Sequence, residues 1–335
     1  MIDASSTSGP WSSTTRAARA ELADTALFDV PLGQYCTYRV GGPAAALVEV
    51  GDLGELDRVA GVVARTGVAT LIVGKGSNLL VADRGFDGLV IMLGPQFAAI
   101  EISDLQPNDG HAHDGVLVEL GGATLLPVAA RATVRAGLTG FEWAVGVPGT
   151  VGGAVRMNAG GHGADMQDSL VRAELLDLGT GERIWRLAGD LELGYRYSNV
   201  AANQVVTRAE IRLHPGTGDE DERLSEIVRW RRAHQPGGAN AGSVFANPTG
   251  DSAGRMIDAA GLKGFRIGCA SVSTKHANFI QVDPPGSADD VATLIDEVRD
   301  RVEAAFGVRL RAENRLVGFE PSTTQGEETA TVDRP

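Results

Sequence analysis

Three polar side chains in this sequence could act on an anionic substrate. Arg196 lies between two tyrosines in the segment GYRYS, and a guanidinium fork is suited to a carboxylate or a phosphate. Ser243 lies in AGSVFANP, where its hydroxyl could donate a proton, contact a ligand or simply occupy a turn. Glu313, near the C-terminus, shares one face of a predicted strand with Arg309 and Arg311. From these residues alone, Arg196 could equally be a surface side chain packed on tyrosine rings, and Glu313 could form a structural ion pair.

Two glycine-rich segments offer backbone N–H groups to a phosphate-bearing ligand. The longer one, GVPGTVGGAVRMNAGG, spans residues 146–161, and the shorter one, GKGSN, follows an apolar run at 74–78. Glycine weakens helices and strands, so we expect loops whose backbone approaches a ligand closely. The shorter segment could also be a plain turn, since it matches neither a P-loop nor a dinucleotide-binding fingerprint. Two such loops indicate a ligand with several phosphates, such as a dinucleotide.

Composition and charge limit the classes to which the protein can belong. The 335 residues, 43% of them hydrophobic, can bury a sizeable core in two or three lobes. A formal net charge of −13 and scattered basic residues argue against a nucleic-acid partner. Cys36 and Cys269 match no metal-binding spacing and favour a reduced compartment or simple burial. Because no apolar run approaches a membrane span and no secretory signal is recognisable, we expect a cytoplasmic protein without a membrane partner.

The pattern of apolar residues predicts three lobes of mixed helices and strands. We expect a first lobe over 25–95, a second over 96–213 and a third over 214–319, with disordered tails over 1–24 and 320–335. Predicted helices span about 52–66, 124–136, 220–233, 252–261 and 287–307, and a predicted closing strand spans 308–313. Antiparallel strands with segregated helices indicate an α+β fold.

Seven motifs occur in the order of one known family. They are TYRVGGPA, VGKGSNLLVADRGFDG, VGVPGTVGGAVRMNAG, GYRYS, AGSVFANP, AGRMIDAAGLKGFRIG and STKHANFI. Through them the chain resembles the UDP-N-acetylenolpyruvoylglucosamine reductases (MurB) of peptidoglycan synthesis over about residues 35–318. Only 47 positions separate Arg196 from Ser243, and MNAGG is present, so the resemblance is to the shorter, type II form without an extra substrate loop.

This resemblance implies noncovalent FAD in the first two lobes, a fold of the vanillyl-alcohol-oxidase (PCMH) type and a C-terminal substrate-binding domain. It implies NADPH as co-substrate and UDP-N-acetylglucosamine enolpyruvate as substrate, reduced to UDP-N-acetylmuramate by what we expect to be a monomer. The resemblance assigns these residues to the cofactor: Arg39, Gly74, Lys75, Gly76, Ser77, Asn78, Leu79, Pro148, Gly149, Gly152, Gly153 and Asn158. It assigns Tyr195, Arg231, His234 and Asn247 to the substrate.

The resemblance also gives roles to the three polar side chains. NADPH passes a hydride to N5 of FAD, from which it reaches C3 of the enolpyruvyl group. Arg196 neutralises the charge that develops on the adjacent carboxylate, and Glu313 in its protonated form donates a hydrogen bond to it. Ser243 delivers the proton to C2. By this resemblance, all three side chains are catalytic rather than structural.

The sequence departs from the family at two positions where lysine is common, which here carry Ala246 and His234. Arg231, one turn before His234, keeps a basic side chain for a diphosphate. One alternative is another FAD-dependent oxidase or dehydrogenase of the same fold, in which His162 could attach the cofactor covalently. That alternative gives no role to Arg196, Ser243 and Glu313. A second alternative, a nucleotide-sugar-binding regulator without catalysis, would be dismissed by measurable turnover.

Overall fold

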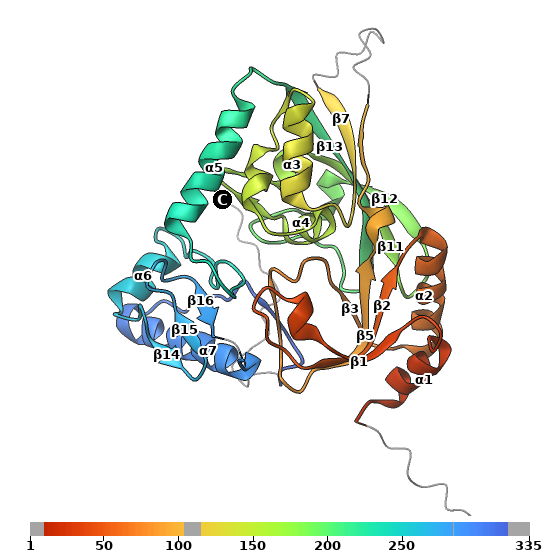
Figure 1. Ribbon diagram of the computed structural model, residues 1–335, viewed down its shortest axis with the longest axis horizontal. Coiled ribbons are helices and arrows are strands. Elements are labelled where there is room, and N and C mark those ends of the chain that lie inside the picture. Colours follow the sequence, from red (N-terminus) through yellow and green to blue (C-terminus); the bar gives the residue numbers. More distant parts are fainter. Residues whose placement is uncertain (1–9, 104–114, 284, 321–335) are drawn as a thin grey trace, which may run out of the picture.

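The first lobe is built on a four-stranded sheet with the strand order β1-β2-β5-β3. The computed structural model of the chain describes residues 10–103, 115–283 and 285–320. Figure 1 shows this sheet at the lower right, with helices α1 and α2 on its outer side. β1 is antiparallel to β2, whereas β2 and β3 are both parallel to β5. The elements of this lobe are α1 (Ser13–Glu21), β1 (Leu27–Pro31), β2 (Pro43–Val50), α2 (Leu53–Thr66), β3 (Thr70–Ile72), β4 (Leu79–Val81) and β5 (Phe86–Leu93).

Helix α2 forms where the sequence predicts it. The Asp52 side chain caps its N-terminus by accepting a hydrogen bond from the N–H of Glu55 at 2.8 Å. Gly67 ends the helix in the left-handed region with φ of +64°, a conformation that glycine adopts without strain. The apolar face of α2 packs on β2 and β5, which completes one core cluster of the lobe.

Helix α1 contradicts the prediction of a disordered tail over 1–24. Ser12 caps this helix, and Ala18 and Leu22 are buried against α2 and the sheet. The serine- and threonine-rich composition of the segment misled the prediction, because buried side chains and an ion pair between Arg19 and Asp29 dock the helix on the lobe. Residues 1–9 lie outside the described part of the chain.

The second lobe is a six-stranded sheet in which every pair of neighbours is antiparallel. Its order is β12-β11-β13-β7-β6, and β8 also pairs with β13. The strands are β6 (Ile100–Ile102), β7 (Val116–Gly121), β8 (Leu138–Thr139), β11 (Leu170–Asp177), β12 (Arg183–Leu187) and β13 (Gln204–Pro215), and a small ribbon pairs β9 (Gly160–Gly161) with β10 (Ala164–Asp165). Helices α3 (Leu126–Arg135) and α4 (Val151–Met157) share a core with β7, β11 and β13.

Helix α4 lies inside the segment that the sequence predicts to be a glycine loop, so that prediction is wrong for residues 151–157. Thr150 caps the helix by accepting from the N–H of Gly153 at 3.3 Å. The N–H of Gly152 donates to the carbonyl of Gly122 at 2.8 Å, and a Cβ on Gly152 would meet that oxygen at 3.1 Å. Part of the glycine content therefore serves the close approach of α4 to the sheet, and this packing overrides a poor helix propensity.

The third lobe joins helices to a small antiparallel sheet with the order β14-β15-β16. Figure 1 shows α5 running along the left edge from the second lobe to the third. The elements are α5 (Glu220–His234), α6 (Ala253–Ala259), β14 (Arg266–Ile267), β15 (Ala270–Val272), β16 (Ile280–Val282), α7 (Ala288–Phe306) and β17 (Arg315–Val317). The buried side of α7 packs on α6 and this sheet in one core cluster.

The C-terminal segment returns to the first lobe, which corrects the predicted closing strand over 308–313. Within that range the chain makes only an isolated bridge between Ala312 and Phe245, and the strand β17 begins later, at Arg315. β17 pairs in parallel with β4 of the first lobe. The residues just before β17 are thereby brought beside the segment 74–78 that precedes β4.

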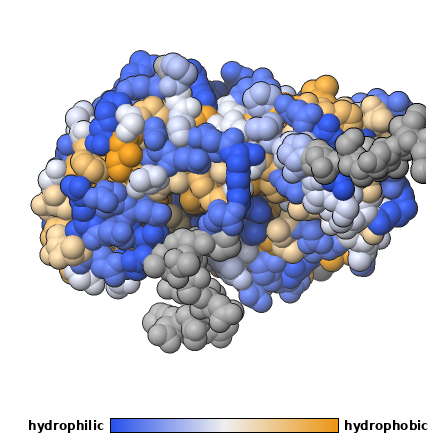
Figure 2. Space-filling view, turned by 90° about the horizontal axis from the view of Figure 1, so that it is seen from below, coloured by the Kyte–Doolittle hydropathy of each residue, from blue (hydrophilic) through white to orange (hydrophobic). Residues whose placement is uncertain are grey.

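We retain 25–95, 96–213 and 214–319 as proposed lobe divisions, with β17 as a strand shared between the third lobe and the first. Residues 321–335 of the predicted C-terminal tail lie outside the described chain. On the face shown in Figure 2, polar residues dominate and apolar ones form small patches. None of the helices in the described ranges is long and apolar enough to cross a bilayer.

Candidate active site

Arg196 lies at the tip of a tight turn between β12 and β13. Gly194 and Tyr197 exchange two backbone hydrogen bonds of 3.1 Å each, so only two residues form the tip. Arg196 has φ of +55°, a region that side chains other than glycine and asparagine enter at a cost. Strain of this kind persists where surrounding structure enforces it, and it occurs often at functional sites.

The turn brings Arg196 to Glu313 from the far end of the chain. Nε of Arg196 lies 3.2 Å from Oε2 of Glu313, and the Tyr195 hydroxyl donates to Oε1 at 3.1 Å. The Arg196 Nη2 also donates to the carbonyl of Gly160 at 3.2 Å. Only 7% of the Glu313 side chain is exposed, whereas 27% of Arg196 is. The Glu313 carboxylate is therefore held by two partners while the guanidinium keeps an accessible edge.

Ser243 is attached to the same place through its backbone neighbours. The carbonyl of Val244 accepts from the N–H of Glu313 at 2.7 Å. The buried Asn278 holds the other side of the segment. Its Oδ1 accepts from the N–H of Phe245 at 2.9 Å, and its backbone carbonyl accepts from the N–H of Val244 at 2.9 Å. Within the described ranges the half-buried Ser243 hydroxyl makes no protein hydrogen bond, so it is free to face a ligand.

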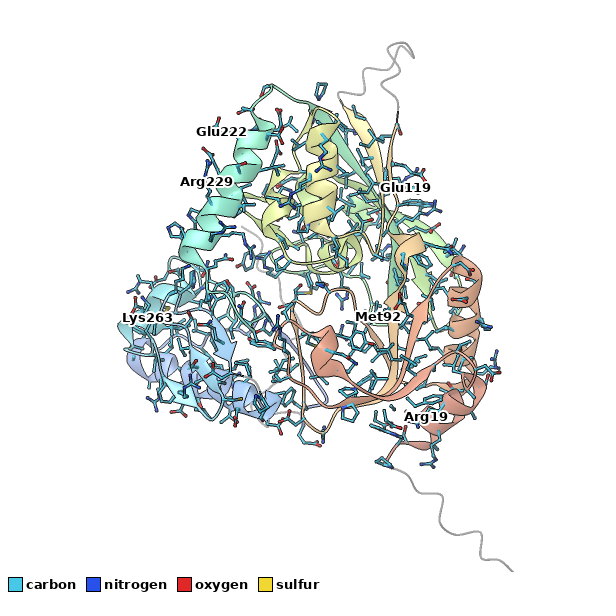
Figure 3. All side chains as sticks on the ribbon, viewed as in Figure 1. Arg19, Met92, Glu119, Glu222, Arg229 and Lys263 are labelled. Carbon is cyan, nitrogen blue, oxygen red and sulfur yellow. The ribbon has the colours of Figure 1, made fainter. Side chains whose placement is uncertain are left out.

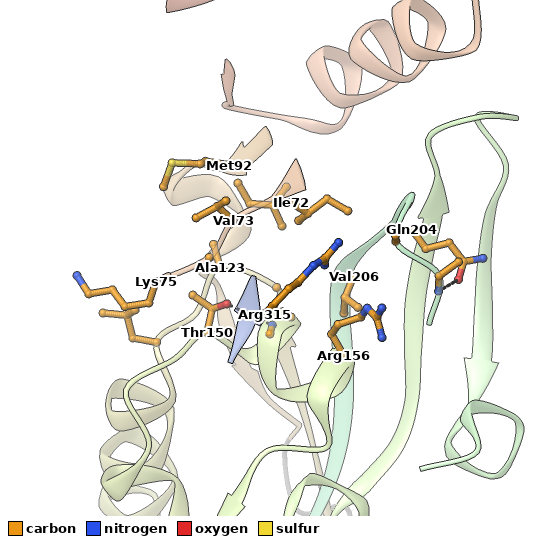
Figure 4. Close-up of a pocket in the computed structure, with 18 residues that line it drawn as sticks. Ile72, Val73, Lys75, Met92, Ala123, Thr150, Arg156, Gln204, Val206 and Arg315 are labelled. Atoms are coloured by element: carbon orange, nitrogen blue, oxygen red, sulfur yellow. Dashed lines mark hydrogen bonds between the residues drawn. The ribbon is translucent and has the colours of Figure 1, made fainter. Parts of the chain in front are cut away.

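A cavity of about 220 Å³ lies between the first and second lobes. Its walls come from the ends of β3 and β5, the turn after β7, the start of α4 and the segment before β13. Figure 4 shows Arg315 projecting into this space from β17, with Arg156 beside it. The lining residues are Ile72, Val73, Gly74, Lys75, Met92, Leu93, Gly122, Ala123, Leu125, Thr150, Gly152, Gly153, Arg156, Ala201, Ala202, Gln204, Val206 and Arg315.

The cavity offers donors and positive charge to an anionic group. Among the described residues, no protein acceptor receives a hydrogen bond from the backbone N–H groups of 74–78. Burial lowers the pKa of Arg315 and of Arg156, and the charge of Arg315 adds to the effect on Arg156. Neither guanidinium has a carboxylate partner within the described chain. Two adjacent, partly buried cations without counter-ions fit a diphosphate, and the apolar walls fit a planar ring system.

Sequence comparisons agree with this arrangement. Residues 44–186 match an FAD binding domain family, and residues 234–317 match the C-terminal domain of UDP-N-acetylenolpyruvoylglucosamine reductase. The protein named UDP-N-acetylenolpyruvoylglucosamine reductase 2 of Symbiobacterium thermophilum is 42% identical over 294 residues, covering 87% of this chain and 92% of the relative. The chain belongs to the UDP-N-acetylenolpyruvoylglucosamine reductase family.

Other members of the reductase family confirm the assignment. A relative of that name from Rubrobacter xylanophilus is 40% identical over 302 residues, covering 89% of this chain and 97% of its own. The crystal structure of the reductase (MurB) from Thermus caldophilus superposes with a TM-score of 0.72 at 35% identity, covering 86% of this chain and 97% of the other. The expected α+β fold, with an FAD-binding domain followed by the C-terminal domain of the reductase family, is confirmed.

The structure distributes the predicted cofactor residues over three places. Gly74, Lys75, Gly152 and Gly153 line the cavity. Behind them the two glycine segments adjoin each other, since a Cβ on Gly149 would lie 3.7 Å from Oγ of Ser77. The remaining predicted cofactor residues are not among those that line the cavity: Arg39, Gly76, Asn78, Leu79, Pro148 and Asn158.

Two of these residues are explained by the protein itself. Gly76 has φ of +60°, and a Cβ there would meet the carbonyl oxygen of Tyr35 at 2.0 Å, so the glycine serves loop packing. Asn158 is 1% exposed, and its side chain bonds to protein partners only. Neither of these two side-chain positions is open to a ligand in the cavity.

Sequence reasoning missed Thr150, Arg156 and Arg315 in the cavity wall. Two signals were available, since Arg156 is the only charged residue in the segment 146–161 and Arg315 follows Glu313 by two positions. The segment 146–161 also offers fewer free backbone donors than the sequence predicts. The N–H groups of Val151, Gly152 and Gly153 already donate to Thr124, Gly122 and Thr150. The segment 74–78 is therefore the main source of backbone N–H donors for a ligand.

The predicted substrate residues lie where the second and third lobes meet, a region that we call the rim. Tyr195 comes from the turn between β12 and β13, Arg231 and His234 come from α5, and Asn247 comes from the segment between α5 and α6. Burial lowers the pKa of Arg231, and this side chain has no carboxylate partner in the described chain. His234 stacks on the Trp230 ring with centroids 4.6 Å apart and is held by the Trp230 carbonyl. The exposed Asn247 accepts from the N–H of Ala253 at 3.1 Å. Arg231 is therefore the better placed of the two basic residues to receive a phosphate.

Proposed function

We propose that this chain reduces the enolpyruvyl group of UDP-N-acetylglucosamine enolpyruvate to the lactyl ether of UDP-N-acetylmuramate, with NADPH as reductant. The observation that supports it most is the contact of Arg196 and Glu313, which brings a guanidinium, a buried carboxyl group and the Ser243 segment together. The names of the relatives support the same reaction. This step supplies a peptidoglycan precursor, and we propose that it is carried out by a cytoplasmic monomer.

Part of FAD would occupy the cavity between the first and second lobes. The N–H groups of 74–78 and the guanidiniums of Arg156 and Arg315 would hold its diphosphate. Neither histidine nor cysteine occurs among the described residues that line the cavity, which supports noncovalent binding. When bound, FAD would relay a hydride from NADPH to C3 of the enolpyruvyl group.

Arg196 and Glu313 would act on the carboxylate of the enolpyruvyl group. As C3 gains a hydride, negative charge develops at C2 and on this carboxylate. The accessible edge of Arg196 can neutralise that charge in a planar, two-point contact. A protonated Glu313 would donate a second hydrogen bond to the substrate carboxylate. Partial burial raises the pKa of Tyr195, so its hydroxyl stays a donor to the Glu313 side chain at neutral pH.

Ser243 would complete the reaction by giving its proton to C2. A hydroxyl is a poor acid in water, so the transfer requires a strongly basic carbon in a site closed to solvent. The absence of a competing protein acceptor among the described residues leaves the hydroxyl available for this transfer. On the rim, Arg231 would hold the substrate diphosphate, with the exposed His234 as a weaker partner.

The test is an assay of NADPH absorbance with the purified protein, with and without UDP-N-acetylglucosamine enolpyruvate. We expect rapid oxidation of NADPH only when the sugar nucleotide is present, and a product heavier by two hydrogens. Slow oxidation that ignores the sugar nucleotide would reject the proposal and favour a flavin oxidase or dehydrogenase. No oxidation by flavin-loaded protein would favour a binding protein.

A further inference from the structure

Asn78 ends the first glycine segment, and its side chain bonds to the C-terminal segment rather than lining the cavity. Its Nδ2 donates to the backbone carbonyl of Glu313 at 3.0 Å, and its Oδ1 accepts from Nδ2 of Asn314 at 3.0 Å. The Asn78 backbone carbonyl also accepts from the N–H of Arg315 at 2.9 Å. Three hydrogen bonds thus attach the backbone around Glu313 to the segment 74–78.

Asn314 extends this attachment into the core. Its Oδ1 accepts from the hydroxyl of Tyr38 at 3.2 Å, and both side chains are almost fully buried. Burial raises the pKa of Tyr38, so the hydroxyl remains a donor across the physiological range. A buried network in which each polar atom has a partner is rigid and specifies one geometry. The backbone of Glu313 is therefore attached to the first lobe through Asn78 and, by way of Asn314, through Tyr38.

Asn158 makes the corresponding attachment for Arg196. It follows α4 in the second glycine segment, and its Nδ2 donates to the carbonyl of Gly194 at 3.0 Å and to Oδ2 of Asp165 at 3.1 Å. Its Oδ1 accepts from the N–H of Gln167 at 2.9 Å. Gly194 is the first residue of the turn whose tip includes Arg196, so the Asn158 side-chain amide anchors the start of this strained turn.

We propose that Asn78 and Asn158 are positioning residues that attach the two partners of the Arg196–Glu313 pair to the two cofactor segments, one to each. This inference rests on the proposed function, because it assigns the asparagines to the step that uses the pair. Neither asparagine is among the described residues that line the cavity. Their loss should therefore spare cofactor binding and impair the step in which charge develops on the substrate.

The test compares two half-reactions in three variants. Asn78→Ala removes both side-chain hydrogen bonds and keeps the backbone one to Arg315, while Asn78→Asp still accepts from Asn314 but cannot donate to the Glu313 carbonyl. Asn158→Gly removes the side chain and keeps the left-handed backbone, which has φ of +40°. FAD affinity of the apo-protein is measured by fluorescence titration. Anaerobic stopped-flow spectroscopy then follows flavin reduction by NADPH and flavin reoxidation by the sugar nucleotide.

We expect FAD affinity and the reduction rate to stay within about threefold of wild type, and reoxidation to slow by about 100-fold or more. Asp52→Ala is the matched control, because it deletes the cap of α2 far from the pair. It should lower the melting temperature but leave both half-reactions unchanged. If Asn78→Ala fails to fold, Asn78→Asp decides the outcome for that residue.

Three outcomes would overturn the inference. Loss of FAD from Asn78→Asp or Asn158→Gly would make the asparagines cofactor residues, as the sequence suggested. Equal slowing of both half-reactions would make them general structural residues, and unchanged reoxidation would give them no role. A wild-type protein whose NADPH oxidation ignores the sugar nucleotide would refute the proposed function itself, and this control precedes the variants.

Discussion

Nε of Arg196 lies 3.2 Å from Oε2 of Glu313, although 117 positions separate the two residues in the sequence. The contact joins a strained turn of the second lobe to the C-terminal segment, which in turn pairs with the first lobe through β17 and β4. A single ion pair therefore lies where all three lobes meet. The contact therefore places a partly exposed guanidinium beside a nearly buried carboxyl group at this junction.

Arg196→Lys should be strongly damaging even though it keeps the positive charge. A lysine ammonium is a point charge, so it cannot contact Glu313 and a substrate carboxylate in one plane. We expect kcat/KM to fall by about 100-fold or more while FAD stays bound. Steady-state kinetics with the sugar nucleotide varied would show this. Near-normal constants would reduce Arg196 to a structural residue.

Gly76→Ala should remove the flavin by displacing the segment 74–78. A Cβ there would lie 2.0 Å from the Tyr35 carbonyl oxygen in addition to occupying φ of +60°. Gly67→Ala is the matched control, since Gly67 has φ of +64° but nothing within 4 Å of the added carbon. The control should lose about 1 kcal/mol of stability and should keep its bound flavin. A Gly76 variant with a full complement of FAD would show that the segment does not hold the cofactor.

Arg315→Gln should weaken FAD binding by about tenfold or more, because it removes a charged donor from the cavity. Arg229→Gln serves as control, since Arg229 projects from the outer side of α5, as Figure 3 shows. The two variants are compared by titrating apo-protein with FAD at several salt concentrations. An unchanged affinity and salt dependence in Arg315→Gln would remove this residue from the diphosphate site.

Arg231→Gln should raise the KM for the sugar nucleotide by about tenfold with little change in kcat, because the reacting group lies elsewhere. His234→Gln should have a smaller effect, since His234 is exposed and stacked on Trp230. The control is again Arg229→Gln. A fall in kcat without a change in KM would place Arg231 at the chemistry rather than on the rim.

The sequence predicted the elements whose signals are local. Helix α2 carries its own cap at Asp52 and its own stop at Gly67, and α7 ends likewise at Gly307. The proposed catalytic positions came from motif resemblance. The structure brings Arg196 into contact with Glu313, and Ser243 directly precedes Val244, whose carbonyl accepts from the N–H of Glu313.

Elements that depend on distant partners could not be predicted from local patterns. The alternation from Val308 to Glu313 is typical of a strand, yet that stretch makes only one bridge, between Ala312 and Phe245. The bridge consists of backbone hydrogen bonds from Ala246 to Arg311 and from Glu313 to Val244. Helix α4 forms despite its glycines because they let it approach Gly122. The resemblance assigned Asn78 and Asn158 to the cofactor, whereas their side chains donate to backbone carbonyls of the protein that lie 235 and 36 positions away.

The most direct test of the account is a comparison of wild type and Ser243→Ala by anaerobic stopped-flow absorbance. NADPH is mixed with each enzyme first, and UDP-N-acetylglucosamine enolpyruvate is added to the reduced enzyme second. We predict that NADPH bleaches the flavin of Ser243→Ala at the wild-type rate, whereas the sugar nucleotide restores its colour at least about 1,000-fold more slowly than in wild type. Restoration at the wild-type rate would remove Ser243 from proton transfer and contradict the mechanism proposed for this site.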